Sequence, residues 1–201
     1  MATETLTPER ILEASEEVLR RFGPAKATVV DVARALGVSH GSVYRHFPSK
    51  AALRDAVTER WLAGISAPLE RVADGEGAAS DRLGRWLDLL VRSKRTKALE
   101  DPELFATYVA LTADARGVVK AHVDALVGQL ARILEDGVAQ GAFEKTADSV
   151  STARAVFDAT SRFHNPAHAA AWSEPGIDAE YEAVQTLVLR GLERKRPRGR
   201  T

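Results

Sequence analysis

Residues 28–53 read TVVDVARALGVSHGSVYRHFPSKAAL, and this stretch decides the fold of the amino-terminal part of the chain. Thr28 is a good helix N-cap, and Asp31 follows three residues later, close to the pattern of a capping box. Gly37 ends an apolar helical stretch and is the residue type that takes a left-handed conformation there. Ser39 caps a second, short helix, which a proline ends. We therefore predict two short helices joined by a tight turn and followed at once by a third helix.

The second of these helices has a polar and aromatic outer side. Val43 and Phe47 lie four residues apart and are expected to anchor the helix inward. The side chains left outside are those of His40, Ser42, Tyr44 and Arg45. Two short helices joined by a turn make a helix-turn-helix, whose second helix enters the DNA major groove. The residues by themselves thus indicate a DNA-binding protein.

Lys50 lies in the first turn of the third helix, where a positive charge opposes the helix dipole. A phosphate would reverse this effect, because the backbone N–H groups and the lysine would then face the same anion. The alternative is that Lys50 is only a solvated surface residue. The neighbouring Tyr44 and His46 favour the phosphate contact.

The segments VARALGVSHGSVY and YRHFPSKAAL resemble the amino-terminal DNA-binding domain of the tetracycline-repressor (TetR) family of bacterial regulators. The resemblance covers about residues 8–55. Its matching positions are Thr28, Ala33, Gly37, Val38, Tyr44, His46, Phe47 and Lys50. The resemblance implies base-edge contacts from His40, Gly41 and Ser42. It implies phosphate contacts from Thr28, Tyr44, His46 and Lys50.

Ser39 and Arg45 complete the predicted DNA-binding set, because they belong to the polar surface of the same short helix. One departure from the family pattern concerns Val29 and Val30, which stand where members often carry a threonine, serine or arginine that touches DNA. These two valines can offer DNA only backbone or apolar contacts.

The chain has a formal net charge of zero, which is unusual for a DNA-binding protein. Residues 1–60 carry a net charge of +1, residues 61–189 carry −6 and residues 190–201 carry +5. Binding must therefore depend on the local placement of cations, and its salt dependence should be moderate. The basic tail is either a solvated end that aids solubility or a source of non-specific DNA contact.

Composition excludes several other classes of protein. The 201 residues are 45% hydrophobic, which is enough for a buried core. No apolar run approaches the ~20 residues that a membrane span requires, and the first residues lack the apolar core of a secretory signal. The absence of cysteine rules out disulfides. Pro166 separates His164 from His168 and disrupts the continuous helix that a metal-binding pair would need. We expect a cytoplasmic protein without metal or cofactor.

The rest of the chain shows helical periodicity and no strand alternation, so the predicted fold class is all-α. The expected helices cover residues 8–22, 49–66 or somewhat beyond, 81 to about 94, about 102–109, 116–140, 147–163 and 177–192. We expect Phe22 on the buried face of the first, a kink or end at Pro68, a linker at 73–80 and a polar break at 95–101. The predicted domains are a three-helix DNA-binding domain at 1–55, a helical bundle at 56–193 and a basic tail at 194–201.

In the TetR family the second domain binds a small molecule and forms a homodimer through its last two long helices. The resemblance places these helices at about 147–163 and 178–193. Candidate pocket residues are the large or polar-tipped side chains Trp61, Trp86, Phe105, Tyr108, His122 and Phe157. The alternative for each is an ordinary core position.

No nucleophile motif, phosphate loop or dinucleotide fingerprint is present, so we do not expect an enzyme. The leading hypothesis is a homodimeric repressor that a small molecule releases from a palindromic operator in double-stranded DNA. A constitutive or activating DNA-binding protein is one alternative, and ligand-induced release distinguishes it. A helical enzyme or scaffold is the other, and specific DNA binding distinguishes that one.

Overall fold

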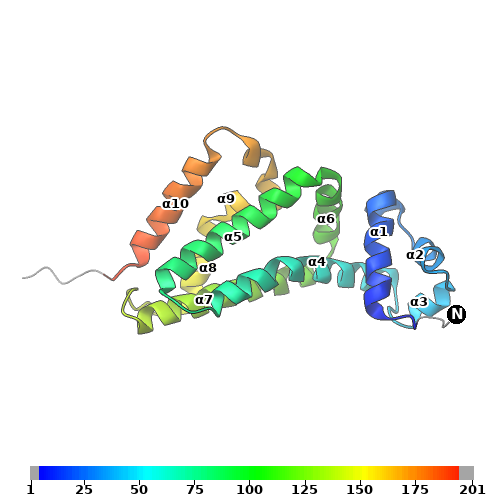
Figure 1. Ribbon diagram of the computed structural model, residues 1–201, viewed down its shortest axis with the longest axis horizontal. Helices are drawn as coiled ribbons and strands as arrows, with labels where there is room; N and C mark the ends of the chain where they lie inside the picture. The colour runs from blue at the N-terminus through cyan, green and yellow to red at the C-terminus, as the bar shows by residue number, and fades with distance from the viewer. Residues whose placement is uncertain (1–4, 195–201) are drawn as a thin grey trace, which may run out of the picture. The chain divides into compact units, whose positions relative to one another are not determined.

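The computed structural model describes residues 5–194, in which every regular element is helical (Figure 1). The predicted all-α class is confirmed for these residues. The chain divides into two compact units. The first contains the chain up to Ala63 together with Asp101–His122, and the second contains Gly64–Glu100 and the chain from Val123 onward. The predicted basic tail lies, apart from Arg194, outside the described residues.

The first unit packs short helices around one apolar core. Its elements are α1 (Pro8–Lys26), α2 (Val29–Leu36), α3 (His40–Tyr44), the first part of α4 (Lys50–Ala73), α6 (Pro102–Asp114) and the first residues of α7 (Arg116–Ala139). Ile11, Val43 and Val57 are fully buried in this core, and Leu111 of α6 joins them. The helix-turn-helix is thus held by a helix that precedes it and by helices that follow it.

The helix-turn-helix forms as its sequence signals predict. The Thr28 side chain and the Asp31 side chain cap α2 reciprocally, which confirms a capping box. Gly37 ends α2 with φ at 66°, in the left-handed region. The Ser39 hydroxyl accepts the backbone N–H of Ser42, at 3.2 Å, and so caps α3.

Helix α1 departs from expectation near its end. Gly23 has φ at 72° and interrupts the helix, as expected, but helical structure resumes and continues to Lys26. Phe22 was expected to be buried and is instead 41% exposed. The guanidinium of Arg21 lies 5.2 Å from the centre of the Phe22 ring. Phe22 is not part of the apolar core of this unit, and its ring packs against the Arg21 side chain instead.

The second unit is a bundle of longer helices. Its elements are the remainder of α4, α5 (Ala79–Glu100), most of α7, α8 (Ser149–Ala159), α9 (Ser161–His164), the 3₁₀ helix η1 (Pro166–Ser173) and α10 (Ile177–Leu192). Its core contains fully buried Trp86, Leu87, Leu130 and Ile133. The break predicted at Asn165–Pro166 is confirmed as the junction of α9 and η1.

Of the two alternatives predicted at Pro68, a kink or an end, the end is excluded, and the break predicted at 95–101 is wrong for residues 95–100. Helix α4 does not end at Pro68 but continues to Ala73, because the proline removes only one backbone hydrogen bond while Leu69 and Ala73 remain buried in the core. Residues 95–100 are not a break, since α5 runs to Glu100. This segment contains no glycine or proline, and Asp101 alone separates it from α6, where it acts as the N-cap.

The helix predicted at 147–163 is shorter and interrupted. Thr160 separates α8 from α9, and its hydroxyl donates to the backbone carbonyls of Val156 and Phe157, at 3.1 Å each. Such side-chain bonds compete with the regular helical pattern. The interruption is therefore a local effect of Thr160.

Candidate nucleic-acid interface

The nine predicted DNA-binding residues lie between the N-cap of α2 and the start of α4 in the first unit. Eight are exposed and one, Ser42, is half-buried. They are Thr28, Ser39, His40, Gly41, Ser42, Tyr44, Arg45, His46 and Lys50. Val43 stands among them with no exposed surface and anchors α3 in the core. The structure thus presents this segment outward on a short helix that one apolar residue secures.

Thr28 makes its hydrogen bonds with Asp31. The Asp31 carboxylate accepts the Thr28 hydroxyl at 2.6 Å and the Thr28 backbone N–H at 3.1 Å. The hydroxyl bond is the main reason that the pKa of Asp31 lies below its ordinary value. The Thr28 hydroxyl proton therefore points at a carboxylate, and a contact with phosphate requires that proton to turn away.

Helix α3 carries two rows of side chains. Ser39, Ser42 and Arg45 follow each other at intervals of three residues. The hydroxyl oxygens of Ser39 and Ser42 are 2.9 Å apart, and Nη2 of Arg45 donates to the Ser42 hydroxyl at 3.3 Å. The second row is His40 and Tyr44, whose rings meet edge to face with centres 6.3 Å apart. Both rows offer hydrogen-bonding groups at the surface of the helix.

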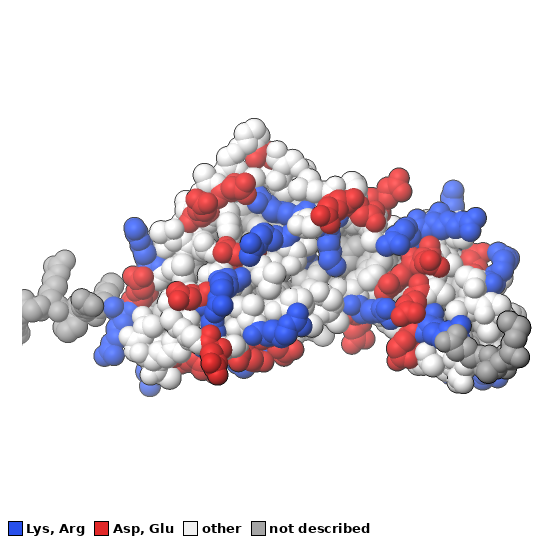
Figure 2. Space-filling model, viewed as in Figure 1, with Lys and Arg blue, Asp and Glu red and all other residues white. Residues whose placement is uncertain are grey.

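The cations near the helix-turn-helix differ in how they are paired. Arg34 lies 2.9 Å from the Asp31 carboxylate, and Arg54 lies 3.1 Å from that of Asp114. Arg45 and Lys50 make no ion pair within the described chain. Figure 2 shows lysine and arginine interspersed with aspartate and glutamate on the face drawn. The positive charge available to DNA is therefore confined to a few unpaired cations such as Arg45 and Lys50, as the net charge of zero led us to expect.

The predicted ligand-pocket residues fall in both units. Trp61, Phe105, Tyr108 and His122 belong to the first unit, where the Tyr108 ring centre lies 5.8 Å from that of Trp61 and 6.1 Å from that of Phe105. Burial raises the pKa of the Tyr108 phenol. Three of the six residues thus form an aromatic cluster.

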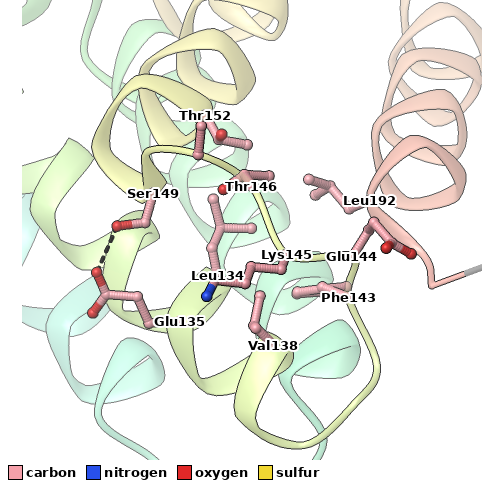
Figure 3. A pocket seen from close by; sticks show the side chains of 11 residues that line it. Leu134, Glu135, Val138, Phe143, Glu144, Lys145, Thr146, Ser149, Thr152 and Leu192 are labelled. Atoms are coloured by element: carbon pink, nitrogen blue, oxygen red, sulfur yellow. Dashed lines mark hydrogen bonds between the residues drawn. The ribbon is translucent and has the colours of Figure 1, made fainter.

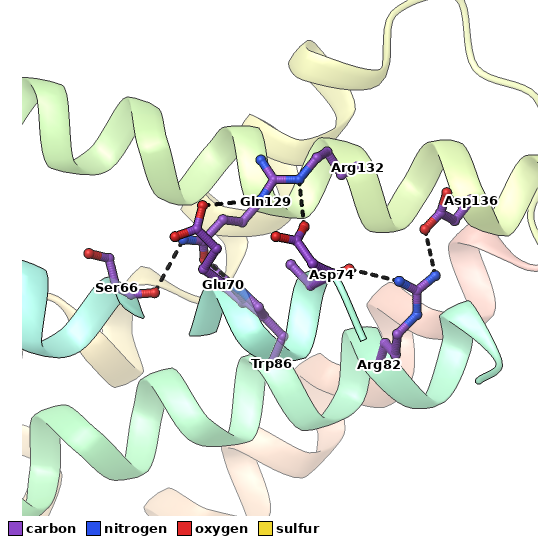
Figure 4. A network of polar contacts seen from close by, with 9 residues as sticks. Ser66, Glu70, Asp74, Arg82, Trp86, Gln129, Arg132 and Asp136 are labelled. Carbon is purple, nitrogen blue, oxygen red and sulfur yellow. Dashed lines mark hydrogen bonds and ion pairs between the residues drawn. The ribbon is translucent and has the colours of Figure 1, made fainter. Parts of the chain in front are cut away.

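Trp86 and Phe157 belong to the second unit. Trp86 is fully buried, and its indole N–H donates to the Gln129 side chain at 3.0 Å (Figure 4). The Phe157 ring lies 4.6 Å from the His164 ring, measured between centres. Burial lowers the pKa of His164 to about 4.

The second unit has an open pocket of about 250 Å³ where α7, the loop to α8 and the end of α10 meet (Figure 3). Leu134, Val138, Phe143 and Leu192 supply apolar lining, and the Ser149 hydroxyl bonds the Glu135 carboxylate beside them. None of the six predicted pocket residues lines it. The pocket was not predicted because its lining comes from three separate segments, two of which are short.

Several buried polar residues of the second unit were also missed. They are Arg82, Lys94, Gln129 and His164. Arg82 donates to the Ala73 carbonyl and to the Asp136 carboxylate, each at 2.7 Å (Figure 4). Burial lowers the pKa of Lys94 to about 8. A signal existed for Lys94, since it follows Val91 by three residues and continues the apolar stripe of α5.

Residues 5–194 lack the features of a membrane span and of a metal site. They contain no helix that is long and apolar enough to span a membrane. They contain no group of three or more histidine, aspartate or glutamate side chains arranged to hold a metal ion.

A helix-turn-helix on a small helical unit, joined to a second helical unit, defines the class of helix-turn-helix transcriptional regulators. Two family models match the chain. "Bacterial regulatory proteins, tetR family" matches residues 11–57, and "Tetracyclin repressor-like, C-terminal domain" matches residues 79–185. The chain therefore belongs to the TetR family of bacterial regulators.

Relatives of known function share part of the sequence. The HTH-type transcriptional repressor KstR of Mycolicibacterium smegmatis is 30% identical over 151 residues, which cover 75% of this chain and 71% of KstR. The nucleoid occlusion factor SlmA of Vibrio atlanticus is 34% identical over 93 residues, 45% of this chain. The match spans 47% of SlmA, about half of its length.

Solved structures of TetR-like regulators share the fold. SmeT, the repressor of a multidrug efflux pump of Stenotrophomonas maltophilia, superposes with a TM-score of 0.67 at 20% identity, over 96% of this chain and 93% of SmeT. PfmR, a TetR family regulator of Thermus thermophilus, has a TM-score of 0.56 at 28% identity, over 96% of this chain and 100% of PfmR.

Proposed function

We propose that this protein is a homodimeric repressor that binds a palindromic operator in the cytoplasm and leaves it when a small molecule binds. The observation that carries the proposal is the outward face of α3, where Ser39, His40, Tyr44 and Arg45 are exposed while Val43 is buried. A recognition helix needs this combination of a fixed inner side and a hydrogen-bonding outer side. KstR and SmeT are both repressors, which supports repression as the action of this protein.

A two-fold dimer is part of the proposal, because one helix-turn-helix reads few base pairs and two copies read two half-sites. We propose the interface on α8 and α10, within the ranges 147–163 and 178–193. Val150 is 54% exposed and Leu187 is 73% exposed, which supports an interface there, since large apolar side chains gain from burial. Leu187→Lys should shift sedimentation toward the monomer. Glu182→Lys, an exposed change on the same helix that alters charge without removing apolar surface, is the control.

The proposed regulation is a shift between conformations of the dimer. Helix α4 contributes residues to both units, so a ligand that contacts this helix has a continuous helix through which to act. We assign DNA binding to residues 1–55, regulation and dimerisation to residues 56–193, and no fixed role to the tail 194–201. Trp61, Phe105 and Tyr108 form the aromatic cluster from which we would begin a search for the ligand site.

The experiment that tests the proposal is the selection of binding sites from random DNA duplexes. The parent protein and its Tyr44→Ala, Lys50→Ala double variant are compared. Enrichment of a palindrome by the parent alone supports a dimeric DNA-binding regulator, and no enrichment at low salt overturns the proposal. The selected duplex then serves in a ligand screen. Compounds that bind the protein and leave its DNA affinity unchanged would argue for a constitutive DNA-binding protein.

A further inference from the structure

Arg45 occupies the middle of the outward side of α3. Successive helical residues are about 100° apart, so residues two positions away from the buried Val43 lie on the opposite side. Gly41 and Arg45 are these two residues, and the backbone of Arg45 is still helical, with φ at −68° and ψ at −27°. Gly41 has no side chain, and a Cβ atom there would meet only the Ser39 hydroxyl, at 3.8 Å. The surface beside Arg45 is therefore open.

Hydrogen bonds direct the Arg45 side chain toward the beginning of α3. Nη2 of Arg45 donates to the Ser42 hydroxyl at 3.3 Å. The Ser42 hydroxyl lies 2.9 Å from that of Ser39, the N-cap. Side chains in helices lean toward the helix N-terminus, so this arrangement follows the normal direction. The N-terminal part of a recognition helix is the part that contacts base edges. The guanidinium thus lies beside Ser42, toward the beginning of α3.

Arg45 also differs from the neighbouring arginines in having no carboxylate beside it in the described chain. Arg34, Arg54 and Arg60 of the same unit each lie within 4 Å of a carboxylate. Arg45 makes no such pair with any residue of the described chain, and its one bond is to a neutral hydroxyl. An arginine in this state has four N–H groups left to donate.

We propose that Arg45 reads a guanine in each operator half-site, donating to O6 and N7 in the major groove, and that Ser42 positions it. Arginine makes this two-point contact with guanine more often than any other specific contact. Ser42 then acts through Arg45 rather than by touching a base itself. This inference rests on the proposed DNA-binding function and adds a base identity and a residue to it.

The test uses the duplex selected by the parent protein and replaces its guanines one at a time by 7-deazaguanine, which lacks only the N7 acceptor. The parent should lose roughly tenfold in affinity at one guanine of each half-site. Arg45→Ala should bind the natural and the substituted duplex equally. Arg45→Lys keeps the positive charge but lacks the planar guanidinium that donates two parallel hydrogen bonds. It should recover only part of the difference in affinity between the natural and the substituted duplex. Arg71→Ala, which changes an exposed arginine of the second unit, should behave as the parent.

Ser42 is tested by the discrimination ratio and not by affinity alone. Ser42→Ala should lower the ratio of the affinity for the natural duplex to the affinity for the substituted duplex. Ser42→Thr should restore this ratio, because threonine keeps the hydroxyl. If Arg45→Ala weakens binding equally on natural, substituted and unrelated duplexes, Arg45 contacts phosphate and the inference is wrong. Selected sites without a guanine in either half-site overturn it as well. Failure of the parent to select any DNA would instead remove the proposed function.

Discussion

The indole N–H of Trp86 and the side-chain oxygen of Gln129 form a hydrogen bond of 3.0 Å inside the core of the second unit (Figure 4). The other end of the Gln129 amide donates to the backbone carbonyl of Ser66 at 3.2 Å. One buried side chain on α7 therefore ties α5 to the second half of α4. Trp86 was a candidate pocket residue because of its indole N–H, and this N–H is hydrogen-bonded within the core.

Replacing Gln129 should destabilise the protein. Gln129→Leu keeps a similar volume but leaves the Trp86 N–H without its acceptor and removes the hydrogen bond to the Ser66 carbonyl, which should lower the free energy of unfolding by about 1–3 kcal/mol. Urea denaturation measures this change. In the Trp86→Phe background, the further loss from Gln129→Leu should be smaller, because the donor is already absent. A Gln129→Leu variant as stable as the parent would contradict this account.

Two glycines of α7 should respond to alanine in opposite directions. A Cβ on Gly137 would lie 2.0 Å from the ring of Phe143, which is 3% exposed and packed on the helix backbone. Gly137→Ala should therefore lower the free energy of unfolding by about 1–3 kcal/mol or more. A Cβ on Gly128 meets nothing within 4 Å, so Gly128→Ala should raise stability by up to about 1 kcal/mol. Urea denaturation of the two variants measures both changes in the free energy of unfolding. A change of the same sign in both variants would refute the packing argument.

The helix-turn-helix was predictable because its signals are local. The cap at Thr28, the left-handed Gly37 and the cap at Ser39 each act on neighbouring residues, and each forms as expected. The continuation of α4 past Pro68 could not be predicted, for the opposite reason. Whether a helix continues past a weak local signal depends on what its next turn buries, and Leu69 and Ala73 are buried by residues distant in sequence.

The polar interior of the second unit could not be predicted in the same way. Gln129 is identified as a hub only when the partners on α4 and α5 are known, and those lie more than forty residues away. The same limit applies to the pocket of Figure 3, whose apolar lining residues Leu134, Phe143 and Leu192 come from segments that are separate in sequence. Tertiary contacts of this kind leave no periodic signal in a single sequence.

His164 should make stability depend on pH. Burial lowers its pKa to about 4 in the folded protein, against 6.5 when unfolded, so between these values the unfolded chain binds more protons. The stability that His164 contributes is complete above pH 6.5 and is lost as the pH falls toward 4, by roughly 3 kcal/mol in all. Lys94, which faces His164, remains charged throughout this window and does not change the sign.

The measurement that isolates this effect compares the parent with His164→Gln, because carboxylates titrate in the same range in both proteins. Glutamine retains an N–H that can bond the Phe157 carbonyl, as Nε2 of His164 does at 3.2 Å. The stability difference between the two should move in favour of the variant as the pH falls from 6.5 to 4. A difference that is constant with pH would mean that the imidazole titrates normally in the folded protein.

DNA contacts of the two proposed kinds should differ in their dependence on sequence and on salt. Lys50→Ala and Tyr44→Phe remove groups proposed to contact phosphate, so both should weaken binding to every duplex, and Lys50→Ala should lower the slope of log affinity against log salt by about 1. His40→Ala removes a proposed base contact and should instead relax the preference at particular base pairs, by about 1–3 kcal/mol, with little change in the salt slope. Fluorescence titrations with the selected duplex and a scrambled duplex, at several salt concentrations, separate the two patterns. Equal losses on both duplexes for all three variants would show that the roles assigned to α3 and α4 are wrong.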